Sequence, residues 1–183
     1  MRNVVVYELV SVDGVAEEPS DWVFDVDEEV FTHLRTIIER QDDVLLGRGT
    51  YDYWAGHWPT SDMEPFAGFI NRTRKHVVTS SPLTQPWQNS TVVPGPVEPW
   101  VAALKDGEGG DIGVHASITL TRSLLRAGLV DELRLLVAPT VAGTGRRLFD
   151  EDGALQRLEL VDAVRTPSGI LLLDYRVGAP AQV

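Results

Sequence analysis

The chain has 183 residues, of which 43% are apolar and 23% are charged, a size and balance that indicate one globular domain with a substantial core. Its formal net charge of -11 argues against nucleic acid as a partner, because phosphate-backbone binding needs a basic face. With no cysteine, disulfides, thiolate metal sites and cysteine nucleophiles are excluded. The start of the chain offers no signal peptide, and no segment approaches the roughly 20 apolar residues of a membrane span. We therefore expect a cytoplasmic protein without a membrane partner.

Strands and helices are expected to alternate along the chain. The first strand, 4–12, is almost continuously apolar, which is typical of a strand buried on both faces. A loop over 15–26 and a helix from about 27 to 40 follow. Further strands are predicted at 43–46, 75–79, 91–93, 111–114, 133–141, 158–164 and 170–177. Further helical segments are predicted at 47–54, 97–105 and 120–127, and a short segment of unassigned type at about 66–71.

Turn chemistry indicates where several of these elements end. Gly128 is a natural cap for the helix before it, and the run 166–169, Thr-Pro-Ser-Gly, predicts a tight hairpin turn. Alternating strands and helices that close on an antiparallel hairpin imply an α/β fold. We predict a mixed, mainly parallel sheet with helices on both faces.

Two stretches, 44–51 and 112–120, each predict a strand that runs directly into a helix through a turn of small residues. Such a turn directs free backbone N–H groups and the positive end of a helix dipole at one place, which suits a phosphate group. Arg48 adds a planar cation that could select an extra phosphate. In the first turn, Gly47 permits close approach, and Thr50 could cap the helix or donate to phosphate. Together the two turns favour a cofactor of the NADPH type, although the first could be an ordinary turn with a surface arginine.

Other motifs are less specific. Thr79, Ser80 and Ser81 end a strand near the same sheet edge and could donate hydroxyls to phosphate, or they could be an ordinary serine-rich strand end. The segment 143–147, Gly-Thr-Gly-Arg-Arg, lacks the third glycine and the following helix of a dinucleotide-binding motif. We interpret it as a tight turn with two exposed arginines that could close over a ligand.

Asp13 and His115 are the candidate catalytic residues. Asp13 could face a pocket at the carboxyl end of the first strand, or it could be a turn residue. His115 lies in the second candidate turn and could be a proton donor or a strand-end histidine bonded to backbone. The four histidines show no metal-ligand spacing, so we predict no metal site.

A family resemblance rests on longer motifs. The segments 124–133 and 138–149, the run Ser-Val-Asp-Gly at 11–14 and the run Leu-Gly-Arg-Gly-Thr-Tyr at 46–51 carry it. Together they resemble the C-terminal reductase domain of the bifunctional riboflavin-biosynthesis deaminase/reductase and its stand-alone dihydrofolate-reductase-like relatives. The resemblance spans residues 4–175.

The resemblance implies a dihydrofolate-reductase-like three-layer sandwich that binds NADPH across the carboxyl edge of its sheet. Gly47, Arg48 and Thr50 would then meet the adenosine-side phosphates, and Thr79, Ser80 and Ser81 would lie beside the 2′-phosphate. The pyrophosphate would be held by Ala116, Ser117, Ile118 and Thr119. Asp13 and Trp22 would lie near the nicotinamide and the substrate. Relatives are often homodimers, for which the apolar strand 133–141 is a plausible seam.

Two departures bear on the substrate. The riboflavin-pathway reductases carry an acidic residue where this chain has His115, and a glycine where it has Ser117. The first change argues against the riboflavin intermediate as substrate, and the second could crowd the pyrophosphate. We therefore expect an NADPH-dependent reductase of a small heteroaromatic or carbonyl substrate, with Asp13 orienting the substrate and His115 donating a proton. The alternative is a non-catalytic dimeric nucleotide- or flavin-binding module.

Overall fold

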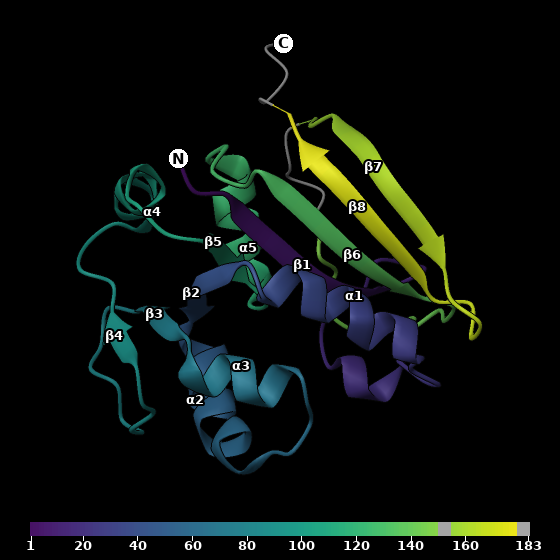
Figure 1. Ribbon diagram of the computed structural model, residues 1–183, viewed down its shortest axis with the longest axis horizontal. Coiled ribbons are helices and arrows are strands. Elements are labelled where there is room, and N and C mark those ends of the chain that lie inside the picture. The colour runs from purple at the N-terminus through teal and green to yellow at the C-terminus, as the bar shows by residue number, and fades with distance from the viewer. Residues whose placement is uncertain (150–154, 179–183) are drawn as a thin grey trace.

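The computed structural model describes residues 1–149 and 155–178. Its centre is an eight-stranded sheet in the order β4-β3-β2-β5-β1-β6-β8-β7 (Figure 1). Strands β1 to β6 run parallel to one another, whereas β8 pairs antiparallel with β6 and β7 pairs antiparallel with β8. The strands are β1 (Val4–Ser11), β2 (Gln41–Gly47), β3 (Arg74–Val78), β4 (Ser90–Val92), β5 (Asp111–Val114), β6 (Glu132–Ala138), β7 (Leu158–Arg165) and β8 (Leu171–Val177).

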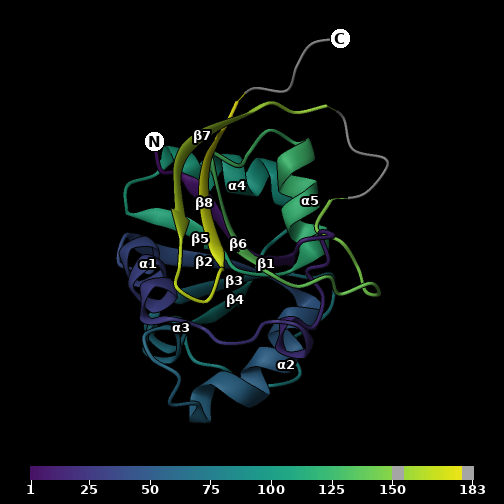
Figure 2. The same ribbon diagram turned by 90° about the vertical axis from the view of Figure 1, so that its right-hand side faces the viewer.

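Helices cover both faces of the sheet, with α1, α2 and α3 on one side and α4 and α5 on the other (Figure 2). The helices are α1 (Glu28–Ile38), α2 (Arg48–His57), α3 (Phe66–Arg72), α4 (Val97–Asp106) and α5 (Ile118–Arg126), with short 3-10 turns η1 (Pro19–Asp21) and η2 (Trp58–Thr60). The predicted three-layer arrangement with a mainly parallel sheet is therefore confirmed.

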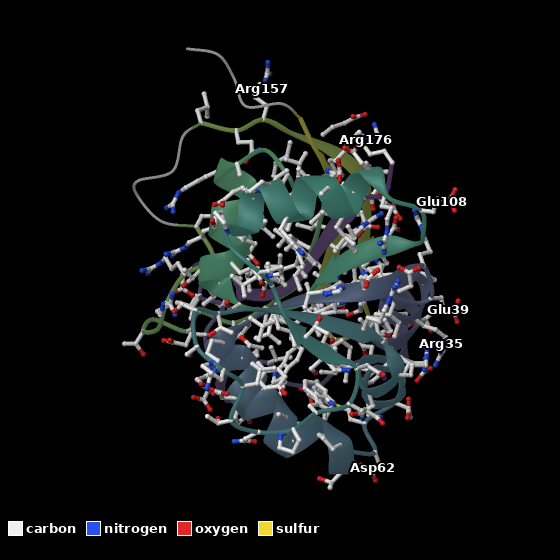
Figure 3. All side chains as sticks on the ribbon, turned by 90° about the vertical axis from the view of Figure 1, so that its left-hand side faces the viewer. Arg35, Glu39, Asp62, Glu108, Arg157 and Arg176 are labelled. Atoms are coloured by element: carbon white, nitrogen blue, oxygen red, sulfur yellow. The ribbon has the colours of Figure 1, made fainter. Side chains whose placement is uncertain are left out.

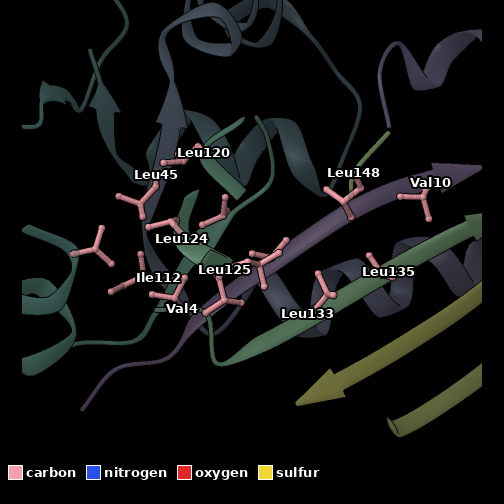
Figure 4. Close-up of a cluster of buried hydrophobic side chains, with 14 residues drawn as sticks. Val4, Val10, Leu45, Ile112, Leu120, Leu124, Leu125, Leu133, Leu135 and Leu148 are labelled. Atoms are coloured by element: carbon pink, nitrogen blue, oxygen red, sulfur yellow. The ribbon is translucent and has the colours of Figure 1, made fainter. Parts of the chain in front are cut away.

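Strand β1 lies between β5 and β6 and contributes to the core on both faces. Val5 and Tyr7 pack in a cluster with Ile37 of α1. The side chains of Val4, Val6 and Val10 point to the opposite face of β1. There they join a larger cluster that includes Leu120 and Leu124 of α5 and Leu135 of β6 (Figure 4). Because successive side chains of a strand point to opposite faces, β1 can place different chemistry on each side of the sheet.

Local turn chemistry formed as predicted. Gly128 adopts φ +65° after α5, and its N–H bonds to the carbonyl of Leu125 at 3.0 Å while Leu129 bonds back to Leu124 at 3.0 Å. This is the paired capping pattern that favours glycine. Gly169 adopts φ +89°, and its N–H bonds to the carbonyl of Thr166 at 3.0 Å in the β7–β8 hairpin.

Strand β6 does not support the predicted dimer seam at 133–141. It ends at Ala138 and pairs with β1 on one side and β8 on the other. Leu133, Leu136 and Ala138 are buried within the chain itself. An internal strand with buried side chains has no free edge or face for a second copy. The edge strand next to β8 is β7, all of whose residues are exposed, and β4 forms the opposite edge of the sheet.

Many of the charged side chains, which make up 23% of the residues, lie on the surface. Charged side chains such as Arg35, Glu39 and Glu108 project outward (Figure 3). Among the residues with described structure, no helix is both long enough and apolar enough to cross a bilayer.

Candidate functional site

The two predicted phosphate-binding turns meet at the carboxyl edge of the sheet. Strands β2 and β5 pair in parallel, so the turns that follow Gly47 and Val114 lie next to each other. A Cβ built on Gly47 would lie 2.3 Å from Ser117 Oγ, which shows how closely the second turn approaches the first. Because Gly47 has no Cβ, the side chain of Ser117 can occupy the space beside it. The two turns, predicted separately from the sequence, therefore lie side by side in the fold.

Each turn delivers a helix N-terminus to this edge. Helix α2 begins at Arg48 with Gly47 as its N-cap, and α5 begins at Ile118 with Ser117 as its N-cap; neither N-cap makes a side-chain capping bond. The capping role considered for Thr50 is wrong, because Thr50 already lies within the first turn of α2. Unsatisfied backbone N–H groups of a helix start are suitable donors for an anion.

Arg48 joins the first turn to the loop that follows β3. Its Nη1 donates to Ser81 Oγ at 2.8 Å and to the carbonyl of Pro82 at 2.9 Å, while Nε bonds Asp52 at 2.7 Å. Thr79 Oγ1 accepts from the N–H of Ser81 at 3.2 Å. Thus Arg48, Thr79 and Ser81, predicted separately, form one cationic and hydroxyl-bearing corner, with exposed Ser80 in the same loop.

An open hollow of about 430 Å³ adjoins this corner. Its lining includes Thr84, whose hydroxyl lies 3.4 Å from Arg48 Nη2, and the largely buried rings of Tyr51 and Trp87. The hollow leaves room beside Arg48 for part of a ligand.

A loop after β6 reaches across to α5. Arg146 donates from Nη2 to Thr119 Oγ1 at 2.9 Å, on the exposed first turn of α5. Arg147 Nε donates to the backbone carbonyl of Asp13 at 2.9 Å. The sequence pointed to this segment through its paired glycines and arginines, but the contact between Arg146 and Thr119 was missed because the two residues are 27 positions apart.

Asp13 holds the same loop. Its Oδ1 accepts hydrogen bonds from Ser11 Oγ at 2.7 Å and from the N–H of Ala142 at 2.9 Å, and Oδ2 accepts from the N–H of Gly143 at 3.0 Å. These hydrogen bonds lower the pKa of Asp13 to about 2, and the bond from Ser11 has the largest effect. Asp13 is therefore an ionised acceptor that ties β1 to the arginine-bearing loop; its role toward a substrate stays a prediction.

His115 follows β5 but points into the layer beneath α3. Its Nε2 lies 2.7 Å from Gln41 Oε1, and its ring contacts those of Phe66 and Phe69. Nδ1 is buried without a partner among the described residues. Burial lowers the pKa of His115 to about 3, so the ring is neutral at physiological pH. The proton-donor role of His115 stays a prediction, and it would require the neutral imidazole.

Trp22 is 5% exposed and donates its indole N–H to the carbonyl of Glu17 at 2.9 Å. This contact anchors the loop between β1 and α1. The predicted position of Trp22 beside a substrate stays untested.

Comparison with known proteins places the chain in a family. A family model described as the RibD C-terminal domain matches residues 2–172. The chain belongs to this family. The uncharacterized protein YyaP of Bacillus subtilis (strain 168) is 26% identical over 180 residues, which cover 95% of this chain and 94% of that protein.

Solved structures share the fold. A Shewanella sp. PV-4 protein, provisionally assigned to riboflavin biosynthesis, superposes with a TM-score of 0.78 at 19% identity, covering 97% of this chain and 99% of that one. The dihydrofolate reductase of Enterococcus faecalis, solved with NADP(H), gives a TM-score of 0.63 at 16% identity, with 97% of each chain covered. The predicted dihydrofolate-reductase-like fold and RibD C-terminal resemblance are therefore confirmed.

Proposed function

We propose that this RibD C-terminal domain protein is an NADPH-dependent reductase of a small heteroaromatic or carbonyl substrate. The observation that carries the proposal is the contact between the two strand–helix turns, at Gly47 and Ser117, with Arg48 tied into the hydroxyl-bearing loop beside them. NADPH, when bound, would supply the hydride. The protein would bind it, orient it and exclude water around it.

The donors at the sheet edge fit such a cofactor. Arg48, with Thr79 and Ser81, would take the 2′-phosphate, since a planar guanidinium among hydroxyls suits a dianion. The N-terminal N–H groups of α5, with Thr119 and Arg146, would hold the diphosphate. These local donors are needed because the net charge of -11 repels an anion at longer range.

The test is a comparison of NADPH with NADH. We expect NADPH to quench the fluorescence of the chain's 5 tryptophans and to raise its melting temperature more than NADH does. Arg48→Ala should weaken NADPH binding about tenfold or more and leave NADH binding nearly unchanged, because it removes charge-assisted bonds to phosphate. Arg35→Ala, on the exposed side of α1, is the matched control. Equal binding of both nucleotides by the native protein would overturn the proposal.

A specific observation supports a second candidate, a non-catalytic nucleotide- or flavin-binding module. The Asp13 carboxylate is occupied by three donors, and His115 is buried and neutral. Near pH 7 the Asp13 carboxyl is therefore ionised and the His115 ring is uncharged, so neither group is in its acidic form. Stabilisation by NADPH or FMN without NADPH oxidation across pterins, flavins and pyrimidines would favour this module, and a yellow purified protein would identify flavin.

We also propose that the protein is a homodimer that pairs through β7. This edge strand exposes Leu160, Val161 and Val164 at 53%, 54% and 40%, an apolar strip that isolated edge strands rarely retain. A second copy could continue the sheet there. Sedimentation should give about twice the chain mass, and Val161→Lys should give the monomer. A native monomer at micromolar concentration would contradict the proposal.

A further inference from the structure

Glu8 is a buried carboxyl that none of the roles above uses. It lies in β1 on the α5 side of the sheet and is 5% exposed. Its Oε1 accepts a hydrogen bond from Thr121 Oγ1 at 2.9 Å, and Thr121 is fully buried at 0% exposure. A buried acid held by a neutral hydroxyl, with no cation bonded to it among the described residues, needs a physical explanation.

The register places Glu8 directly under the second turn. Val6 pairs with Val114, the last residue of β5, so Glu8 lies two residues further along β1, level with the turn that leads into α5. The N–H of Thr121 bonds to the carbonyl of Ser117 at 2.9 Å and closes the first turn of α5. Glu8 therefore lies on the buried side of the helix N-terminus whose exposed side carries Thr119.

The elements packed around Glu8 offer little to stabilise a negative charge. Val6 and Val10 flank it on its face of β1, and Leu135 is its partner in β6. The charged groups of the neighbouring elements bond to other partners. Arg146 donates to Thr119 and Arg122 donates to the carbonyl of Leu148, whereas the carboxylates of Glu98 and Asp13 accept from Ser123 and Ser11. Burial accordingly raises the pKa of Glu8 to about 7, opposed only in part by the bond from Thr121.

We propose that Glu8 is a positioning residue that couples cofactor binding to proton uptake at the α5 N-terminus. This inference rests on the proposed function. A diphosphate on the exposed side and a carboxylate on the buried side would compete for one positive helix end. Binding of the cofactor would therefore favour transfer of a proton from solvent to the Glu8 carboxylate. The neutral acid that results does not repel the diphosphate. A rise of about one unit in the pKa of Glu8 on binding corresponds to about a tenfold change in the affinity between the protonated and the charged protein.

Calorimetric titration of the full chain with NADPH tests this. In buffers of different ionisation enthalpy, the native protein should take up about half a proton per cofactor near pH 7.5, and its affinity should fall roughly sevenfold from pH 6 to pH 8.5. Glu8→Gln keeps the neutral shape of the protonated acid, so its affinity should stay flat with pH. Proton exchange by the nucleotide's own phosphates is common to both proteins and cancels in the difference.

Two further variants make the result specific. Thr121→Val removes the donor that favours the charged carboxylate, so the fall in affinity should move to higher pH. Glu98→Gln, which removes an exposed carboxylate from the outer side of the same helix pair, should keep the native profile.

Each outcome decides a different claim. Equal proton uptake by the native protein and Glu8→Gln would overturn the inference and leave the proposed function intact. Absence of NADPH binding by the native protein at pH 6 would overturn the proposed function and the inference with it. Should Glu8→Gln fail to fold by circular dichroism, identical pH midpoints for the native protein and Thr121→Val would overturn the inference.

Discussion

Replacement of Glu8 by glutamine should change how the stability of the protein depends on pH, with no ligand present. The pKa of Glu8 is raised by burial from 4.5 to about 7 in the folded chain. The folded state therefore binds the proton more tightly than the unfolded state does. The resulting stabilisation is complete below about pH 4.5 and is lost as the pH rises to about 7.

The size of the effect follows from the shift. A raised pKa of this size amounts to about 3 kcal/mol in all, of which about 2.5 kcal/mol is lost between pH 5 and pH 8. The positive end of α5 should offset up to about 1 kcal/mol by favouring the charged carboxylate. We therefore expect the free energy of unfolding of Glu8→Gln, relative to the native protein, to rise by about 1.5–2.5 kcal/mol from pH 5 to pH 8.

Urea unfolding followed by tryptophan fluorescence at pH 5, 6, 7 and 8 measures this difference directly. The buried amide that Glu8→Gln introduces adds a constant cost at every pH, so the change with pH is informative and the absolute value is not. A difference that stays constant within about 0.5 kcal/mol would show that Glu8 titrates normally in the folded chain. That result would refute the reasoning from burial and the inference built on it.

Two other predictions concern the corner and its loop. Gly47→Ala should lower the free energy of unfolding by about 1–2 kcal/mol, because the new Cβ would lie 2.3 Å from Ser117 Oγ, and Ser117→Gly in the same chain should restore it. For Asp13, whose pKa is lowered to about 2 by the bonds from Ser11 and Ala142, the stabilisation is present above about pH 4 and is lost as the pH falls toward 2. Asp13→Asn should therefore flatten the acid limb of the melting-temperature profile, and an unchanged limb would show that the loop does not depend on the charge.

Features set by neighbouring residues could be predicted from the sequence. The strand at 111–114, the cap at Gly128 and the turn before Gly169 formed as expected, because each depends on local φ preferences and nearby hydrogen bonds. The meeting of Gly47 with Ser117 was also accessible, since parallel strands deliver their carboxyl ends to one edge.

Features set by distant pairing could not be predicted in this way. The apolar strand β6 suggested a dimer seam, but apolarity cannot distinguish an internal strand from an interface strand. His115 and Gln41 are 74 positions apart, and Glu8 and Thr121 are 113 positions apart. No periodicity within either segment indicates these partners. Each side chain became informative only when the sheet order was known.

The buried titratable residues nearest the proposed cofactor site, Glu8 on one face of the sheet and His115 and Tyr7 on the other, are all uncharged between about pH 3 and about pH 7; we call them the neutral floor of the site. On the α5 side, burial keeps the proton on Glu8 up to about pH 7, because the pKa of its carboxyl is raised. On the α1 and α3 side, burial lowers the pKa of His115 to about 3 and raises the pKa of Tyr7, so both rings are neutral. The cations Arg48 and Arg146 lie at the rim instead. In a chain with a net charge of -11, this separation of a neutral floor from a cationic rim is what would let a polyanionic nucleotide approach the sheet edge.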